Sequence, residues 1–109
     1  MGYVYFISNQ YSIKIGYTKN NPKKRLKQLQ TGSSERLYLL GYVKGDLEKE
    51  KSLHKKFAQF KLRNNGEWFS ADDELIEYIN LVNEMPDVAV IKNDLWNNIV
   101  MTVPKIKIV

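Results

Sequence analysis

The sequence predicts an α+β fold in which helices pack on a small antiparallel or mixed β-sheet. The chain has 109 residues, which is enough for one domain with one modest core. Hydrophobic residues make up 43% of the chain and charged residues 27%, which is typical of a globular protein and not of a disordered one. Segments with the two-residue period of strands alternate with segments that have the period of helices.

The first predicted elements are two strands and a short helix. Residues 3–7 and 11–17 are rich in aromatic and β-branched residues, and the polar residues 8–10 between them favour a turn. This pair is expected to form a β-hairpin. Asn21 before Pro22 is typical of a helix start, and it predicts a short helix over residues 22–30.

The later elements follow the same alternation. Residues 37–43 predict a third strand, and residues 46–61 have the helical period. The side chains expected on the buried side of that helix are Leu47, Leu53, Phe57 and Phe60. Residues 67–69 form a short extended piece, and residues 70–73 resemble a capping box that starts a third helix, which runs to about residue 84.

The chain is expected to form a folded domain over residues 1–85, followed by an extension over residues 86–109. Pro86 breaks the third helix, and the segment after it is apolar and rich in β-branched residues. This extension either adds strands to the edge of the sheet or makes a contact between two copies of the chain, which would give a homodimer.

Composition excludes several classes of protein. The chain has no cysteine, so a disulfide scaffold and a thiolate site are excluded, and its single histidine excludes a His-rich zinc site. No apolar run approaches the roughly 20 residues that span a bilayer. The first residues lack the basic region of a signal peptide. We therefore expect a soluble intracellular protein with no membrane partner.

Positive charge is concentrated in the first two thirds of the chain. Residues 1–70 carry 14 basic and 5 acidic residues, whereas residues 71–109 carry 3 basic and 7 acidic residues. A basic surface suits a polyanion, because every phosphate that it neutralises releases condensed counterions. Charge alone is equally consistent with a lysine-rich surface that serves only solubility.

An ordered series of short motifs resembles the GIY-YIG nuclease superfamily, in particular a short phage and bacterial branch with Lys-Ile-Gly in place of Tyr-Ile-Gly. The resemblance covers about residues 2–84. It implies a three-stranded antiparallel sheet flanked by helices, and cleavage of DNA with one divalent ion, Mg²⁺ or Mn²⁺. The motifs are Tyr3-Val4-Tyr5, Lys14-Ile15-Gly16-Tyr17-Thr18, residues 24–32, residues 50–57 and Gly66-Glu67-Trp68-Phe69.

The resemblance assigns roles to five residues. Tyr5 matches the tyrosine of the first motif, Lys14 stands where most members have the second tyrosine, and Gly16 is the glycine of that motif. Arg25 matches the arginine of the first helix. Glu67 matches the glutamate that binds the metal.

Two further positions are less direct. Many members have an asparagine on the last helix, for which Asn80 is the candidate, able to orient Tyr5 or a metal-bound water. Many also have a His or Tyr one helical turn after the arginine, where this chain has Leu29. Either that role is dispensable or Tyr17 or His54 supplies it.

Phosphodiester hydrolysis explains why these residue types are needed. Water attacks in line with the leaving 3′ oxygen, so the site needs a base, a cation and a fixed donor for the nonbridging oxygens. Glu67 is a hard oxygen ligand for Mg²⁺, and the planar guanidinium of Arg25 suits phosphate oxygens. Tyr5 is the expected general base, and Lys14 would favour the phenolate if both side chains face the same side. Without the resemblance, core packing is the simpler interpretation of Tyr5.

The remaining candidates have two interpretations each. His54 is either a proton shuttle near Glu67 or a partly buried histidine paired with Glu50, one helical turn earlier. Three lysines of the first helix either meet flanking phosphates or form an ordinary solvated face; they are Lys23, Lys24 and Lys27.

The predicted function is a metal-dependent DNA endonuclease. Because no separate DNA-binding domain is visible in the sequence, specificity is expected to be weak or to come from a targeting partner. The alternative is a non-catalytic nucleic-acid-binding module that keeps the nuclease fold.

Overall fold

The alternating pattern of the first 18 residues builds the centre of the sheet. The structure is a computed structural model that describes residues 2–63 and 66–83. Strand β1 (Gly2–Ser8) pairs antiparallel with β2 (Ser12–Thr18) on one side and with β3 (Tyr38–Gly45) on the other. A short strand, β4 (Trp68–Ser70), pairs antiparallel with β2, so the sheet order is β3-β1-β2-β4.

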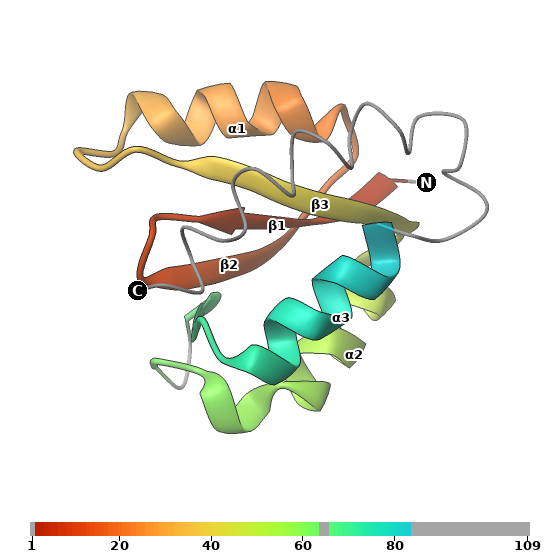
Figure 1. Cartoon of the computed structure of the whole chain (residues 1–109). Helices are drawn as coiled ribbons and strands as arrows, with labels where there is room; N and C mark the ends of the chain where they lie inside the picture. The colour runs from red at the N-terminus through yellow and green to blue at the C-terminus, as the bar shows by residue number, and fades with distance from the viewer. Residues whose placement is uncertain (1, 64–65, 84–109) are drawn as a thin grey trace.

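Three helices cover the two faces of this sheet (Figure 1). Helix α1 (Pro22–Thr31) lies on one face, which we call the α1 face. Helices α2 (Leu47–Lys56) and α3 (Asp73–Asn83) lie on the opposite face, and a 3₁₀ turn, Ala58–Phe60, follows α2. The predicted α+β class is therefore confirmed. Within the described part of the chain, every helix is too short or too polar to traverse a lipid bilayer.

Side-chain caps fix where the helices begin. The Asn21 side chain accepts a hydrogen bond from the Lys23 amide, as expected for a helix with proline at its first position. Asp46 accepts from Lys49 in the same way at the start of α2. The cap of α3 differs from the expectation, because Ser70 belongs to β4 and Asp72 accepts from the Glu74 amide instead.

Two other features differ from the sequence expectation. The extended piece expected at residues 67–69 is confirmed as the three-residue strand β4, but it pairs with β2, so the sheet has four strands where the resemblance implies three. The long predicted helix divides into α2 and the 3₁₀ turn, and Leu47, at its first position, is 52% exposed. The proposed extension, residues 86–109, and any dimer contact that it makes lie outside the described residues.

The alternation of the strands gives two separate cores. Val4 and Phe6 of β1 point into the larger core beneath α2 and α3. Tyr5 and Ile7 point to the α1 face, where leucines of α1 pack against them. The face on which each candidate side chain lies is therefore set by its position along the strand.

Asn83 is a buried polar residue that the sequence analysis did not single out. Its Nδ2 donates a hydrogen bond of 3.0 Å to the carbonyl oxygen of Leu40, which ties the end of α3 to β3. Gly41 makes this approach feasible, because a Cβ there would lie 2.5 Å from Asn83 Oδ1. Asn83 therefore has a structural role on the α2/α3 side of the sheet.

Candidate active site

Tyr5 and Arg25 meet on the α1 face. Tyr5 lies opposite Gly16 in the β1–β2 register, and its side chain is nearly fully buried, with 1% exposure. Arg25 projects from α1, and its Nε lies 3.5 Å from the Tyr5 hydroxyl, to which it donates a long hydrogen bond. The phenol is thus in contact with a partly exposed guanidinium.

The Tyr5 ring lies against Gly16, so this position accepts no side chain without rearrangement. A Cβ on Gly16 would lie 2.4 Å from the Tyr5 hydroxyl oxygen. This contact gives the physical reason for a glycine at this point of β2, since only glycine leaves room for the phenol. The conformational freedom of glycine is not the reason for a glycine at position 16.

Gly16→Ala is expected to lower the free energy of unfolding by about 1 to 3 kcal/mol, because the added methyl must displace Tyr5. The Tyr5 hydroxyl should move with the ring. Chemical denaturation measures the first effect. Gly32→Ala is the matched control, because nothing lies within 4 Å of a Cβ at Gly32 and its backbone φ of −95° suits alanine. Equal stabilities for the two variants would contradict the packing argument.

Lys14 and Glu67 form a second pair. Lys14 Nζ lies 2.8 Å from Glu67 Oε1, and the exposed fractions of the two side chains are 15% and 44%. Backbone pairing positions the glutamate, because its carbonyl oxygen accepts a hydrogen bond from the Ile15 amide at 3.0 Å. The sequence predicts that Lys14 favours a phenolate at Tyr5 if both side chains face the same side; in the structure the Lys14 ammonium is paired with Glu67.

The two pairs share one region of the sheet. Lys14 lies opposite Ile7, which faces the same way as Tyr5, so Lys14 and Tyr5 are diagonal neighbours across β1 and β2. Such neighbours have Cα atoms about 7–8 Å apart. The structure therefore places Tyr5, Lys14 and Arg25 on the α1 face, with Gly16 beneath the phenol. Glu67 is linked to this group through its ion pair with Lys14.

His54 lies on the other side of the sheet. Its Nε2 is 2.9 Å from the carbonyl oxygen of Ile15 and 3.7 Å from Glu50 Oε2, and its ring packs edge-on against Phe69. A pocket of about 340 Å³ is lined by His54, Glu50 and Glu67. His54 is thus held by the sheet backbone, and it faces Glu67 through this pocket without contacting Tyr5.

The pKa of Glu50 is raised, chiefly because burial removes water from the carboxylate, and next because of the negative charge of Glu67. The charges of His54 and Lys14 oppose this effect without cancelling it. Below the raised pKa the folded state holds the proton more tightly than the unfolded state does. The contribution of Glu50 to stability is therefore greatest at low pH and is lost as the pH rises through that pKa.

Glu50→Gln is expected to remove this pH dependence. The variant should be more stable than the wild type at neutral pH, where the wild type holds a desolvated carboxylate, and the difference should shrink toward pH 4. Thermal unfolding from about pH 4 to pH 8 measures it. Glu48→Gln is the control, because Glu48 is an exposed residue of the same helix. A constant difference between Glu50→Gln and wild type at every pH would contradict the assignment.

Two predicted supporting residues do not join this group. Tyr17 follows Gly16 in β2 and so points to the opposite face, where its hydroxyl lies next to Gly2. Asn80 is on α3, which packs on the α2/α3 face, and it does not reach Tyr5. Leu29 packs in the small core around Tyr5, and neither Tyr17 nor His54 takes its place there.

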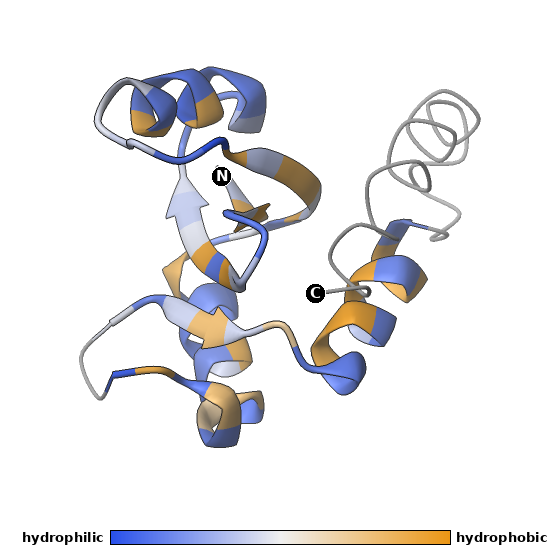
Figure 2. Ribbon diagram, turned by 60° about the vertical axis from the view of Figure 1, so that its left-hand side comes forward, coloured by the Kyte–Doolittle hydropathy of each residue, from blue (hydrophilic) through white to orange (hydrophobic). Residues whose placement is uncertain are grey.

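The exposed side of α1 is basic. Lys23, Lys24 and Lys27 are all exposed, and the first turn of α1 holds no acidic residue (Figure 2 shows this helix mostly in hydrophilic colours, at the top of the view). Positive charge in the first turn opposes the helix dipole and costs about 0.3–1 kcal/mol. Lys23 and Lys24 therefore gain no stability from the helix dipole, and together with Lys27 they form a cationic surface on the same helix as Arg25.

The donor set fits a divalent ion held by few protein ligands. In the described residues, no three His, Cys, Asp or Glu side chains gather into a metal-binding cluster. Mg²⁺ needs no such cluster, because it is often held by one or two carboxylates and retains several waters. Glu67 offers a half-exposed carboxylate of this kind. Glu50 is a second carboxylate nearby, and the negative charge of Glu67 contributes to its raised pKa.

Comparison with known proteins identifies the family of the chain. No curated protein and no solved structure matches the sequence. One family model, the T5orf172 domain, matches residues 2–85 and so includes β1 through α3 with every side chain described above. The chain therefore belongs to the T5orf172 domain family, a phage-associated family with a nuclease-related context.

Proposed function

We propose that this chain is a metal-dependent DNA endonuclease of the GIY-YIG type, which hydrolyses phosphodiester bonds on the α1 face of the sheet. The observation that supports the proposal is a set of two contacts on neighbouring strands: the phenol of Tyr5 contacts the guanidinium of Arg25, and the ammonium of Lys14 contacts the half-exposed carboxylate of Glu67. The four side chains come from β1, α1, β2 and the residue before β4. The nuclease-related family and the basic surface support the same function.

Each side chain has a role that its contacts allow. Arg25 binds nonbridging oxygens of the scissile phosphate, since its planar donors match them. When Arg25 turns to the phosphate, it frees the Tyr5 oxygen; as a phenolate, that oxygen takes a proton from the attacking water and becomes the hydroxyl. Lys14 holds positive charge beside Glu67, and Glu67 would hold the divalent ion. When bound, that ion supplies positive charge for the oxygen that leaves.

The basic surface supplies affinity without sequence information. Lys23, Lys24 and Lys27 would contact phosphates that flank the scissile bond, and such contacts are alike for every sequence. Binding should therefore weaken steeply as the salt concentration rises. A targeting partner would add any preference for particular sequences.

Incubation with supercoiled plasmid and with single-stranded DNA tests the proposal. Cleavage is expected with Mg²⁺ or Mn²⁺ and should stop on addition of EDTA. Product ends should carry a 5′-phosphate and a 3′-hydroxyl, because the 3′ oxygen is the leaving group. Cleavage that continues at full rate in EDTA would contradict metal dependence.

A second function is favoured by one contact. The ion pair between Lys14 and Glu67 already engages one oxygen of the carboxylate that would hold the ion. A non-catalytic nucleic-acid-binding module would retain this pair as a structural link between β2 and β4. Binding of DNA without cleavage in either metal would support this function over the endonuclease.

A further inference from the structure

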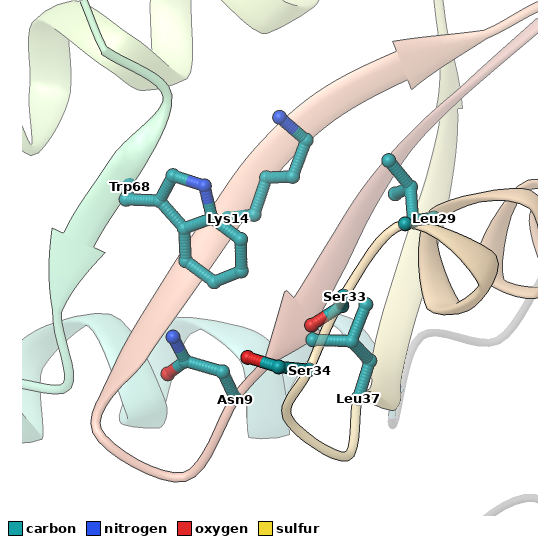
Figure 3. A pocket seen from close by; sticks show the side chains of 8 residues that line it. Asn9, Lys14, Leu29, Ser33, Ser34, Leu37 and Trp68 are labelled. Carbon is teal, nitrogen blue, oxygen red and sulfur yellow. The ribbon is translucent and has the colours of Figure 1, made fainter.

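A second pocket lies on the α1 face, beside the proposed site. It has a volume of about 350 Å³, and it lies between the β1–β2 turn, the loop after α1 and the start of β4. Figure 3 shows the side chains around it. They include Asn9, Lys14, Leu29, Ser34, Leu37 and Trp68.

The walls of this pocket differ in chemistry. Trp68 supplies a partly exposed aromatic ring, and Leu29 and Leu37 add apolar surface. Lys14 Nζ lies 5.8 Å from the centre of the Trp68 ring. The pocket therefore combines a flat aromatic wall with a positive charge at the point where it meets the Lys14–Glu67 pair.

Asn9 contributes a hydrogen-bond donor of fixed direction. Its Oδ1 accepts hydrogen bonds from the Tyr11 amide at 3.1 Å, from the Ser12 amide at 2.8 Å and from the Ser12 hydroxyl at 3.0 Å. These three contacts fix which way the amide group faces. Its Nδ2 donates to no acceptor among the described residues, and Figure 3 shows this nitrogen on the side of Trp68. A ligand in the pocket would meet a donor that is already oriented.

We propose that this pocket binds one unpaired nucleobase of the substrate strand, next to the phosphate at the active site. A nucleobase is flat, stacks on tryptophan and carries acceptors at its edge, which the Asn9 amide and the Ser34 hydroxyl can meet. A volume of about 350 Å³ is at the small end for ligand pockets and suits a single ring system. Because a paired base is not available for such stacking, the pocket favours single-stranded or distorted DNA.

This inference rests on the proposed function in one respect, since it takes nucleic acid as the ligand. It does not require cleavage. Lys14 belongs to both the pocket and the active-site pair, so a base bound here places its own phosphate beside Glu67.

The fluorescence of Trp68 can be used to measure binding of a ligand in this pocket. The chain has two tryptophans, and Trp96→Phe leaves Trp68 as the only one. This variant of the full chain is titrated in EDTA with an oligothymidylate of about 12 nucleotides, and with an abasic oligonucleotide of equal length and charge. The oligothymidylate should quench Trp68 fluorescence and bind about 10-fold more tightly than the abasic strand. Equal affinities, absence of quenching, or no binding of either strand would overturn the proposal.

Variants measured by labelled-oligonucleotide binding separate base recognition from phosphate binding. Trp68→Leu should bring the affinity ratio of the two strands close to one, whereas Tyr11→Leu should leave it unchanged, because Tyr11 is 63% exposed in the neighbouring turn. Asn9→Asp keeps the oxygen that the turn needs and loses the donor, so it should lower the ratio even if Trp68→Leu fails to fold. An unchanged ratio in Asn9→Asp and in folded Trp68→Leu would contradict the pocket.

Cleavage in Mg²⁺ is measured on the same protein. Cleavage with no preference for the strand that carries bases would overturn the base pocket and leave the endonuclease standing. A clear preference without cleavage would support the pocket and overturn the endonuclease.

Discussion

Glu67→Gln is expected to reduce DNA cleavage by at least about 100-fold, because glutamine cannot hold a divalent ion as a carboxylate does. The fold should survive. Glu67 is held by its backbone carbonyl, which the substitution does not change, and its ion pair is partly exposed. Such a pair contributes about 0–1 kcal/mol to the free energy of unfolding. The measurement is the rate of plasmid cleavage in Mg²⁺, together with a thermal unfolding curve.

Glu77→Gln provides the matched control for this prediction. Glu77 is an exposed glutamate of α3, on the helix layer opposite the α1 face. The Glu77→Gln substitution removes the same charge from the molecule without changing the site, so cleavage by this variant should stay near the wild-type rate. Equal losses in the two variants would show that net charge, and not the carboxylate at position 67, determines activity.

Tyr5→Phe is expected to lower the rate of cleavage by about 100- to 10,000-fold, which is the usual contribution of a general base. The substitution removes one hydroxyl and keeps the ring that covers Gly16. Its only described hydrogen bond, from Arg25, is long at 3.5 Å, so the free energy of unfolding should change by no more than about 1 kcal/mol. Single-turnover cleavage at saturating enzyme measures the chemical step without a contribution from binding.

Tyr42→Phe is the control for the loss of a hydroxyl. Tyr42 lies directly opposite Tyr5 on β3 and packs in the same small core. Its variant should cleave at the wild-type rate. Full activity in Tyr5→Phe would assign this tyrosine to core packing alone, and would move the search for the base to another group.

Local patterns in the sequence predict the elements of this fold well. The hairpin of β1 and β2, the start of α1 at Pro22 and the amphipathic α3 all follow from neighbouring residues. The short strand β4 is harder, because three residues show no period. It forms because Phe69 enters the larger core and the backbone of β2 has a free edge there.

The sequence predicts the site less completely. Whether Tyr5 and Lys14 share a face depends on the register of the hairpin, and the pairing of β1 with β2 places them on the same face. The partner of Lys14 cannot be predicted in this way, because Glu67 is 53 residues away and reaches it only through the pairing of β4 with β2. The contact therefore depends on tertiary structure.

Helical period alone also leaves the last helix ambiguous. Asn80 and Asn83 are three residues apart and so lie near the same stripe of α3. Only the packing of the helix on β3 decides that Asn83 is the buried one, bonded to Leu40. Gly41 was the available signal, since a glycine in the interior of a strand often marks a close approach by another group.

The central claim is that Tyr5 and Glu67 act on one phosphate, and a double variant tests it most directly. Residues that act as a unit lose their contributions together, so Tyr5→Phe combined with Glu67→Gln should cleave about as slowly as the slower single variant. The measurement is the single-turnover rate of the wild type, both single variants and the double variant on one DNA substrate. A loss in the double variant equal to the product of the two single losses would contradict the account, because it would show that the phenol and the carboxylate contribute independently.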